Sequence, residues 1–328
     1  MPAPAKLHTI GVLAYAGAQS AAVHGLTDLL TIANRLQAER SAQRVQLEVQ
    51  HWWDANPLPS PRSPLTAIVV PPSVEGPPPR GEASRLAAWL LDRHGEGTLL
   101  CSACAGGFVL AETGLLCGRP ATTHWALRDL FVERFPDVLL DTDRMIVDEG
   151  DIMTAGGLMA WVDLGLRLVD RFLGSTTMLT TARYFLVDPG GREQRFYKTF
   201  APPMTHGDAA ILKVQRWLQA RSGEKSSVPM MARKAGLGER TFLRRFVDAT
   251  ALRPTEYVQH LRVHKASDLL ELKSLTIEEV AGRVGYADPN AFRKIFVRVM
   301  GLSPGDYRRG HHPTRQGVTA REVAEAVG

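Results

Sequence analysis

The stretch RVGYADPNAFRKIFVRVMGLSPGDYRR (residues 283–309) repeats the pattern of a stretch that lies 50 residues earlier in the chain. The repeated positions are Phe246, Leu252, Pro254 and Tyr257, which recur as Phe296, Leu302, Pro304 and Tyr307. In each copy a short helical run ends at a small-Gly-apolar turn, Ala235-Gly236-Leu237 or Val284-Gly285-Tyr286. Glycine permits the positive φ that such a turn requires. A second helical run follows each turn, so the repeat predicts two helix-turn-helix units.

The second helix of each unit is predicted to have one apolar face and one polar face. Phe242 and Phe246 in the first copy, and Phe292 and Phe296 in the second, follow helical spacing and are expected in the core. The opposite faces carry groups that can reach base edges or phosphates. The candidate DNA-binding residues are Arg240, Arg244, Asn290, Arg293 and Lys294.

Between the copies, PTEYVQHLRVHKASDLLELK (residues 254–273) is predicted to form one helix. Roughly 19 residues at a rise of ~1.5 Å span about 28 Å, which is close to the ~34 Å between successive major-groove faces. Residues 209–310 hold 19 Lys+Arg against 10 Asp+Glu, a net charge of +9, whereas the remainder holds 20 against 24, or −4. This distribution indicates a polyanionic partner for the helical region alone.

Residues 209–310 resemble the DNA-binding domain of the AraC/XylS family, and residues 283–309 match the signature stretch of that family nearly throughout. The resemblance implies that the five candidate residues occupy groove-facing positions and that the partner is double-stranded promoter or operator DNA. Two positions depart from the pattern. Pro289 suits a first helical turn but offers no N–H to a phosphate, and Leu243 could read only a thymine methyl.

The first 190 or so residues alternate β-rich apolar runs with amphipathic runs, which predicts an α/β domain with a parallel sheet sandwiched by helices. RMIVDEGDIMTAGG (residues 144–157) is predicted to be a small hairpin that turns at Glu149-Gly150. The aperiodic segment PGGREQRFYKTFAPPMTHGD (residues 189–208) is predicted to be a linker. The expected organisation is therefore an α/β domain at 1–188, a linker at 189–208, an all-α domain at 209–310 and a tail at 311–328.

The composition of the chain indicates its cellular compartment and which kinds of partner it has. No apolar run approaches the roughly 18 residues needed to cross a bilayer, and an odd number of cysteines, three, argues against a disulfide framework. We therefore expect a cytoplasmic protein without a membrane partner. No second Cys/His cluster accompanies Cys101 and Cys104, so neither a metal site nor a cofactor is predicted.

GTLLCSACAGGFVLAE (residues 97–112) predicts a strand that runs directly into a helix, with Cys104 at the junction. Small residues surround Cys104, as a nucleophile elbow requires, and a helix N-terminus there would lower the pKa of the thiol. Cys101 falls inside the strand, which disfavours a C-x-x-C redox pair. Cys101 and Cys117 are predicted to be inert packing residues.

Together with LLCGRPATTHW (residues 115–125), this corner resembles the ThiJ/PfpI branch of the class I glutamine amidotransferase-like superfamily. More specifically, it is similar to the version fused to AraC domains in GlxA-type regulators. The resemblance covers about residues 7–188 and implies a flavodoxin-like sheet. Enzymes of the superfamily pair the elbow cysteine with an acid from the first helix and with backbone donors after the third strand. Here Ala22 stands at the acid position, Pro72 and Ser73 replace the glycines, and Ala105 follows Cys104, so the elbow is expected to be degenerate and non-catalytic.

These features predict a transcriptional regulator that responds to a small, nitrogen-containing effector, and the resemblance favours an activator. The candidate effector-pocket residues are Cys104, Ala105, Ser73, His24 and His124. The expected partners are double-stranded DNA, the effector, a second copy of the chain and, for an activator, RNA polymerase. Two alternatives stay open, namely an amidase- or hydratase-like cysteine enzyme with a DNA-binding appendage, and a thiol-based redox sensor at Cys104.

Overall fold

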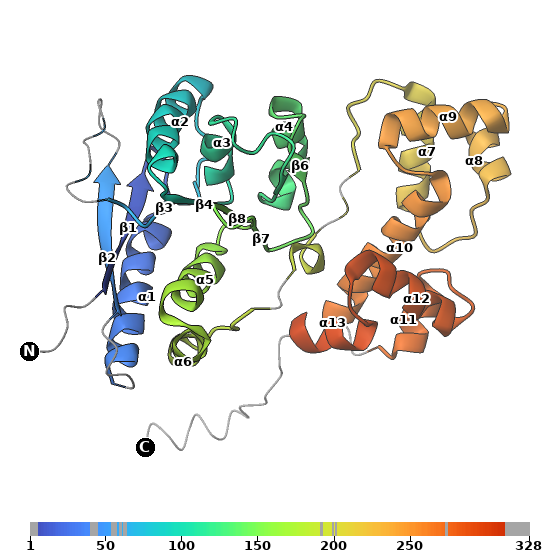
Figure 1. Cartoon of the computed structure of the whole chain (residues 1–328). Helices are drawn as coiled ribbons and strands as arrows, with labels where there is room; N and C mark the ends of the chain where they lie inside the picture. The colour runs from blue at the N-terminus through green and yellow to red at the C-terminus, as the bar shows by residue number, and fades with distance from the viewer. Residues whose placement is uncertain are drawn as a thin grey trace, which may run out of the picture. The chain divides into compact units, whose positions relative to one another are not determined.

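In the computed structural model the chain divides into two compact units, Met1–Arg195 and Phe196–Gly328 (Figure 1). The structure describes residues 6–39, 45–53, 58, 61, 64–190, 193–198, 200, 202–272 and 275–311. The boundary between the units falls inside the segment that we expected to be a linker. The expected tail lies almost entirely outside the described residues.

The first unit is built on a six-stranded sheet of order β2-β1-β3-β4-β8-β7. Its strands are β1 (Lys6–Ala14), β2 (Val45–Trp53), β3 (Ala67–Val70), β4 (Leu99–Ala103), β7 (Ile146–Asp148) and β8 (Ile152–Ala155). All neighbouring pairs are parallel except β7 and β8, which run antiparallel across a turn where Gly150 has φ 92°. The predicted parallel sheet and the predicted hairpin are both confirmed. A separate pair, β5 (Pro120–Ala121) and β6 (Leu139–Leu140), is also parallel.

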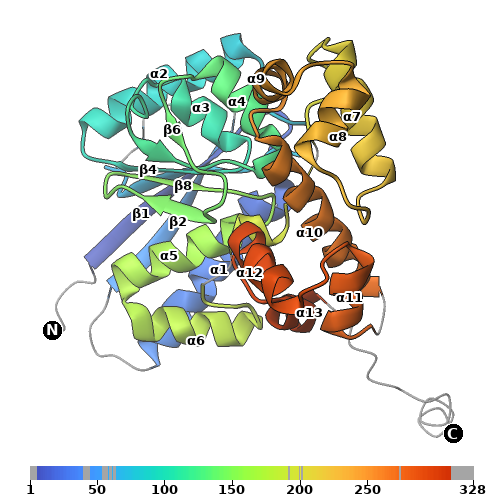
Figure 2. The ribbon, with the colours of Figure 1, turned by 90° about the vertical axis from the view of Figure 1, so that its right-hand side faces the viewer.

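Helices cover both faces of this sheet (Figure 2). One face carries α1 (Ser20–Ala38), α5 (Trp161–Leu173) and α6 (Ser175–Phe185), and the other carries α2 (Arg80–Gly95) and α3 (Gly106–Ala111). The helix α4 (Arg128–Arg134) and the single 3-10 turns η1 (Trp125–Leu127) and η2 (Gln194–Phe196) complete the unit. Because both faces are covered, β3, β4 and β8 are buried at every position, which explains why Ser102 and Thr154 are their only polar residues.

The described residues of the second unit form helices joined by loops, with no strand among them. Its helices are α7 (Ala209–Ala220), α8 (Val228–Ala235), α9 (Glu239–Thr250), α10 (Pro254–Leu272), α11 (Ile277–Arg283), α12 (Pro289–Met300) and α13 (Pro304–His311). The long helix α10 has 19 residues, as predicted, with α7–α9 around its first half and α11–α13 around its second half (Figures 1 and 2). Gly236 and Gly285 adopt φ 70° and 88° at the two helix-turn-helix turns, which confirms the predicted units.

The repeat in sequence is also a repeat in packing. Phe246 meets Tyr257 edge-on with ring centroids 5.2 Å apart, and Phe296 meets Tyr307 edge-on at 5.6 Å. Each pair lies in its own apolar core, one on either half of α10. Each helix-turn-helix unit therefore has a separate core, built around the same aromatic pair.

We predict that Gly106→Ala destabilises the first unit, whereas Gly81→Ala does not. A Cβ on Gly106 would lie 2.5 Å from the carbonyl oxygen of Val70 and 2.7 Å from that of Pro71, while one on Gly81 meets nothing within 4 Å. Overpacking of this kind costs about 1–3 kcal/mol, and an exposed Gly→Ala change in a helix stabilises by roughly 0.5–1 kcal/mol. Urea unfolding followed by tryptophan fluorescence is suitable, since five of the six tryptophans lie in the first unit. Equal midpoints for the two variants would contradict the close approach of α3 to β3.

Candidate functional site

Cys104 occupies the strained turn between β4 and α3. Its φ is 53°, a left-handed value that only Cys104, Leu186 and Ala251 share among the described non-glycine residues. Its N–H donates to the carbonyl of Ala155 (2.8 Å), and its own carbonyl accepts from the Thr123 hydroxyl (2.7 Å). Such strain persists only where surrounding bonds hold it. The corner thus has the backbone form of a nucleophile elbow.

The thiol at this corner is not activated. Burial raises the pKa of Cys104 to about 11, and the hydrogen bond from the Ala105 N–H only partly opposes this rise. Our expectation of a lowered pKa is therefore wrong, because desolvation outweighs the amide dipoles of α3, a helix of six residues. Burial also raises the pKa of Cys101, which is fully enclosed, whereas Cys117 is exposed.

Four positions of the loop after β3 offer no free amide to the thiol. Pro71 and Pro72 have no N–H, and the two amides after Ser73 are engaged. The Val74 N–H donates to the Gly17 carbonyl (3.0 Å), and the Glu75 N–H donates to the Ser73 hydroxyl (3.1 Å). This loop therefore has few donors for an oxyanion.

The usual ligand crevice of a sheet of this type is closed here. In open α/β sheets ligands bind at the carboxyl ends of the strands, where the strand order reverses, and here that point lies between β1 and β3. The Gln19 N–H donates to the Pro72 carbonyl (2.8 Å), and the Tyr15 hydroxyl donates to the Pro71 carbonyl (2.9 Å). A bridge between Ala18 and Ser73 adds to this closure. Ser73 is left 6% exposed and Ala105 is fully buried.

The two candidate histidines have other partners. His24 lies exposed on α1, with its ring centroid 5.9 Å from that of His51 and 6.2 Å from that of Trp53. His124 caps η1 by accepting the Ala126 N–H at Nδ1 (3.0 Å), and burial lowers its pKa. The structure records no contact of either ring with Cys104. That these five residues line one effector pocket stays a prediction.

Gln194, from the expected linker, is a residue whose role the sequence did not indicate. It is 2% exposed, and its amide oxygen accepts the Trp125 N–H (3.1 Å). Its amide nitrogen, which has two hydrogens to donate, lies within hydrogen-bond distance of the Thr122 hydroxyl and of the carbonyls of Thr123 and Arg144, at 2.9, 2.9 and 2.8 Å. The site also requires Gly156, because a Cβ there would lie 1.8 Å from the Gln194 amide nitrogen. A single amide thus ties the segment that follows α6 to the loop beside Cys104.

In the second unit, α9 and α12 present similar faces. All five candidate DNA-binding residues are exposed, and the buried positions recur at the same spacing in both helices. Arg240, Arg244 and Lys294 carry no ion pair, whereas Arg293 pairs with Glu278 (2.6 Å) and donates to Asn290 (3.2 Å). The exposed aliphatic side chains of these faces are Leu243, Val247 and Val297. Asp288 accepts the N–H groups of Asn290 and Ala291 and so caps α12, whose first residue is Pro289, as predicted.

The two helix-turn-helix units are fastened to each other. From the middle of α10, the Arg262 guanidinium donates to the carbonyls of Ser222, Glu224 and Gly285, at 3.2, 2.8 and 3.2 Å. The first two carbonyls belong to the loop between α7 and α8, and the third belongs to the turn before α12. A Cβ on Gly285 would lie 2.5 Å from the Gly223 carbonyl, so this loop and this turn touch. The spacing of α9 and α12 is therefore set by direct contacts as well as by α10.

Within the described ranges, no cluster of three or more His, Cys, Asp or Glu residues is arranged to hold a metal ion. Within the same ranges, no helix combines the length and the apolar character needed to span a membrane.

Each of the two units contains a segment that matches a known protein family. A helix-turn-helix domain family matches residues 231–310, and the DJ-1/PfpI family matches residues 63–171. The HTH-type transcriptional regulator GbdR of Pseudomonas aeruginosa is 26% identical over 234 residues, which cover 70% of this chain and 62% of GbdR. The HTH-type transcriptional regulator GlxA of Rhizobium meliloti is 27% identical over 209 residues, which cover 62% of this chain and 63% of GlxA. The chain thus matches less than two thirds of the length of either relative.

Among solved structures, the DNA-binding domain of AdpA in complex with a target DNA is 36% identical, with a TM-score of 0.31. The alignment covers 33% of this chain and 98% of that domain.

We predict that, at pH 8, N-ethylmaleimide modifies Cys117 quickly and leaves Cys101 and Cys104 unmodified in the folded chain. The thiolate is the reactive form, and a thiol with a pKa of about 11 is ionised in roughly one molecule in 1,000 at that pH. Mass spectrometry of peptides after timed quenching measures each site, and Cys117→Ser should abolish the fast modification. Rapid modification of Cys104 would contradict the buried, protonated thiol and restore the thiol-sensor alternative.

We also predict that Gln194→Ala lowers the free energy of unfolding of the first unit by about 2–4 kcal/mol. The change removes one accepted hydrogen bond and both donors of the amide nitrogen, and it leaves buried donors and acceptors unpaired. Gln46→Ala, at an exposed position of β2, is the matched control and should change stability by less than about 0.5 kcal/mol. Urea midpoints measure both variants. Similar stabilities would show that the segment around Gln194 is not docked in solution.

Proposed function

Because the chain joins a DJ-1/PfpI domain to a helix-turn-helix domain of the AraC type, we propose that it is a DNA-binding transcriptional regulator whose first unit senses a small molecule. The curated relatives GbdR and GlxA carry the name of HTH-type transcriptional regulators, which supports this proposal. A regulator of this kind would act on promoter DNA in the cytoplasm.

The observation that carries the proposal is the pair of matched outer faces on α9 and α12. Arg240 and Arg244 stand one helical turn apart and are exposed without ion pairs, so they are available to bases and phosphates. Asn290 and Lys294 occupy the same positions of the second unit, 50 residues later. The contacts around Arg262 hold the two faces at a fixed spacing, which suits an asymmetric site read through two successive major grooves.

In the same proposal, the DJ-1/PfpI domain binds and does not catalyse. Cys104 keeps the strained elbow, but burial holds its thiol protonated. Ala22 offers no carboxylate where enzymes of the superfamily have one, and the amides after Ser73 are engaged. A protonated nucleophile without a carboxylate base and with few oxyanion donors is a poor catalyst.

The remaining partners follow from this role. Binding of two half-sites by a homodimer, and contact with RNA polymerase in an activator, would complete the regulator. An effector would act by having different affinities for two arrangements of the chain, because only such a difference can shift an equilibrium.

We predict that Arg244→Ala weakens binding to a duplex selected by the protein from random sequences by about 1–3 kcal/mol, if the guanidinium contacts a base. A phosphate contact would instead reduce affinity for all sequences and lower the slope of log K against log[salt] by about 1. Arg216→Ala on α7 is the matched control, since that side chain is exposed, carries no ion pair and lies outside α9. Gel-shift titrations at several salt concentrations measure both variants. An Arg244→Ala variant that binds like Arg216→Ala would overturn the assignment of α9.

A further inference from the structure

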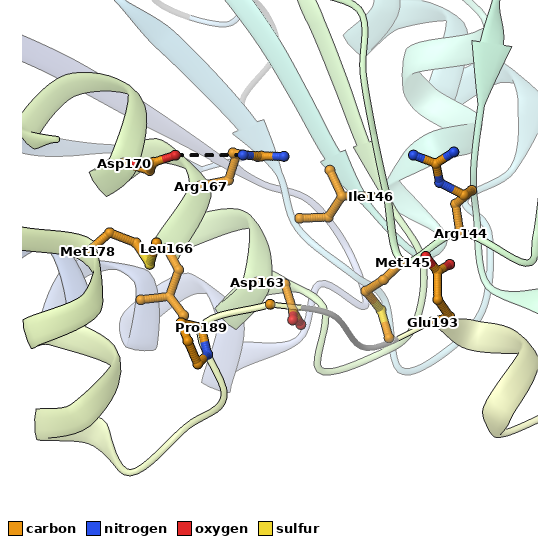
Figure 3. Close-up of a pocket in the computed structure, with 11 residues that line it drawn as sticks. Arg144, Met145, Ile146, Asp163, Leu166, Arg167, Asp170, Met178, Pro189 and Glu193 are labelled. Carbon is orange, nitrogen blue, oxygen red and sulfur yellow. Dashed lines mark ion pairs between the residues drawn. The ribbon is translucent and has the colours of Figure 1, made fainter. Parts of the chain in front are cut away.

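A cavity of about 290 Å³ lies in the first unit, on the face of the sheet that α5 and α6 cover. Its walls come from the start of the β7 hairpin, from α5 and α6, and from the described residues of the segment after α6 (Figure 3). This volume is at the lower end of the range of ligand pockets, roughly 300–1,000 Å³. It suits a small metabolite better than a nucleotide cofactor.

The cavity differs from the Cys104 corner in the side chains that it presents to a ligand. At the corner, hydrogen bonds close the crevice between β1 and β3, and the side chains of Ser73 and Ala105 are buried. The cavity instead combines five charged side chains with an apolar lining. The apolar part consists of Met145, Ile146, Leu166, Met178 and Pro189.

The charged groups of the wall are not equally available to a ligand. Arg167 already pairs with Asp170 (3.6 Å) at one side of the cavity, as Figure 3 shows. Glu193 and Arg144 lie together at the opposite side (Figure 3). One carboxylate oxygen of Glu193 is buried and has no hydrogen-bond partner, and the exposed Arg144 guanidinium has no ion pair.

These two groups indicate the chemistry of a ligand. A buried carboxylate oxygen without a donor is costly, and an ammonium group would satisfy it. A guanidinium without a partner is a good site for a carboxylate. The methionine, leucine and proline side chains would contact the aliphatic part between the two charges.

We propose that this cavity is the effector site, and that its ligand is a small zwitterion with an ammonium and a carboxylate on an aliphatic body. Glu193 binds the ammonium and Arg144 binds the carboxylate. The inference rests on the proposed function in one respect only, namely that occupancy of the cavity alters DNA binding.

The cavity adjoins the last segment of the first unit, so a bound ligand contacts that segment directly. Glu193 stands immediately before Gln194, whose amide is fixed to the Arg144 carbonyl (2.8 Å) and to the loop that includes Thr123. The first unit ends one residue later, at Arg195. A ligand held between Glu193 and Arg144 therefore binds both sides of the contact that anchors the last segment of the sensing unit.

The test uses the full chain and a graded series of zwitterions, from glycine through β-alanine and γ-aminobutyrate to 6-aminohexanoate. Butylamine and butyrate are the matched compounds with a single charge. At about 10 mM, at least one zwitterion should raise the melting temperature by 2 °C or more, and neither singly charged compound should match it. If butylamine stabilises the chain as well as the zwitterions do, the role of Arg144 is wrong. If butyrate does so, the role of Glu193 is wrong. If no compound of the series binds, the proposed ligand class is wrong.

Two charge-removing variants locate the site. Glu193→Gln and Arg144→Gln should each weaken the dissociation constant of the best zwitterion, measured by calorimetry, by about tenfold or more. Glu133→Gln on α4 and Arg183→Gln on α6 are the controls, because both side chains are exposed and lie outside the cavity. Equal affinity in all four variants would place the ligand elsewhere and overturn the proposal. A variant whose melting temperature without ligand equals that of the wild type is folded.

A separate measurement distinguishes this inference from the proposed function. Gel-shift titrations with and without the best zwitterion should show a change in DNA affinity of about fivefold or more for the wild type, and none for Glu193→Gln. Binding of the zwitterion with no DNA binding under any condition would contradict the proposed function and leave the site intact. DNA binding that is unaffected by a bound zwitterion would overturn its assignment as effector.

Discussion

The side-chain amide of Gln194 is the contact on which the arrangement of the sensing unit depends. It binds two hydroxyl-bearing residues before η1, the first amide of η1 and the carbonyl that precedes β7. Through Thr123 it supports the strained backbone of Cys104, and through Arg144 it supports one wall of the cavity. An amide is suited to this task because it offers donors and an acceptor without a charge to desolvate. One side chain from an aperiodic segment thus joins the Cys104 corner to the cavity.

The backbone geometry of the elbow and the reactivity of its thiol depend on different features of the structure. The left-handed Cys104 and the close approach of Gly106 to β3 are packing requirements of the strand-to-helix turn, so they do not by themselves indicate catalysis. The reactivity of the thiol depends on solvation and on nearby donors, and here burial raises its pKa to about 11. Hydrogen bonds also bridge the crevice between β1 and β3, and they too leave the fold unchanged.

Periodic features of the chain were predictable from its sequence, and single contacts between distant segments were not. The helices α9, α10 and α12, the parallel sheet and the β7–β8 hairpin follow from apolar spacing and turn residues. The direction of the Cys104 pKa shift was mispredicted, because helix dipoles are visible in sequence and burial is not. The burial of Gln194 could not be predicted, since nothing in PGGREQRF distinguishes a buried glutamine from a solvated one. The cavity requires β7, α5 and α6 to meet Pro189, Gly190 and Glu193, which only tertiary structure shows.

The rigidity of the second unit limits how an effector can act. Arg262 ties α10 to the loop before α8 and to the turn before α12, and the Gly223 and Gly285 backbones touch, so direct contacts set the spacing of α9 and α12. A signal that worked by changing this spacing would have to break these contacts, at a cost of several hydrogen bonds. A change in the path of the segment after Gln194 breaks none of these Arg262 hydrogen bonds in the second unit. Regulation is therefore expected to alter where that unit is presented, or how two copies present it together, and not its internal geometry.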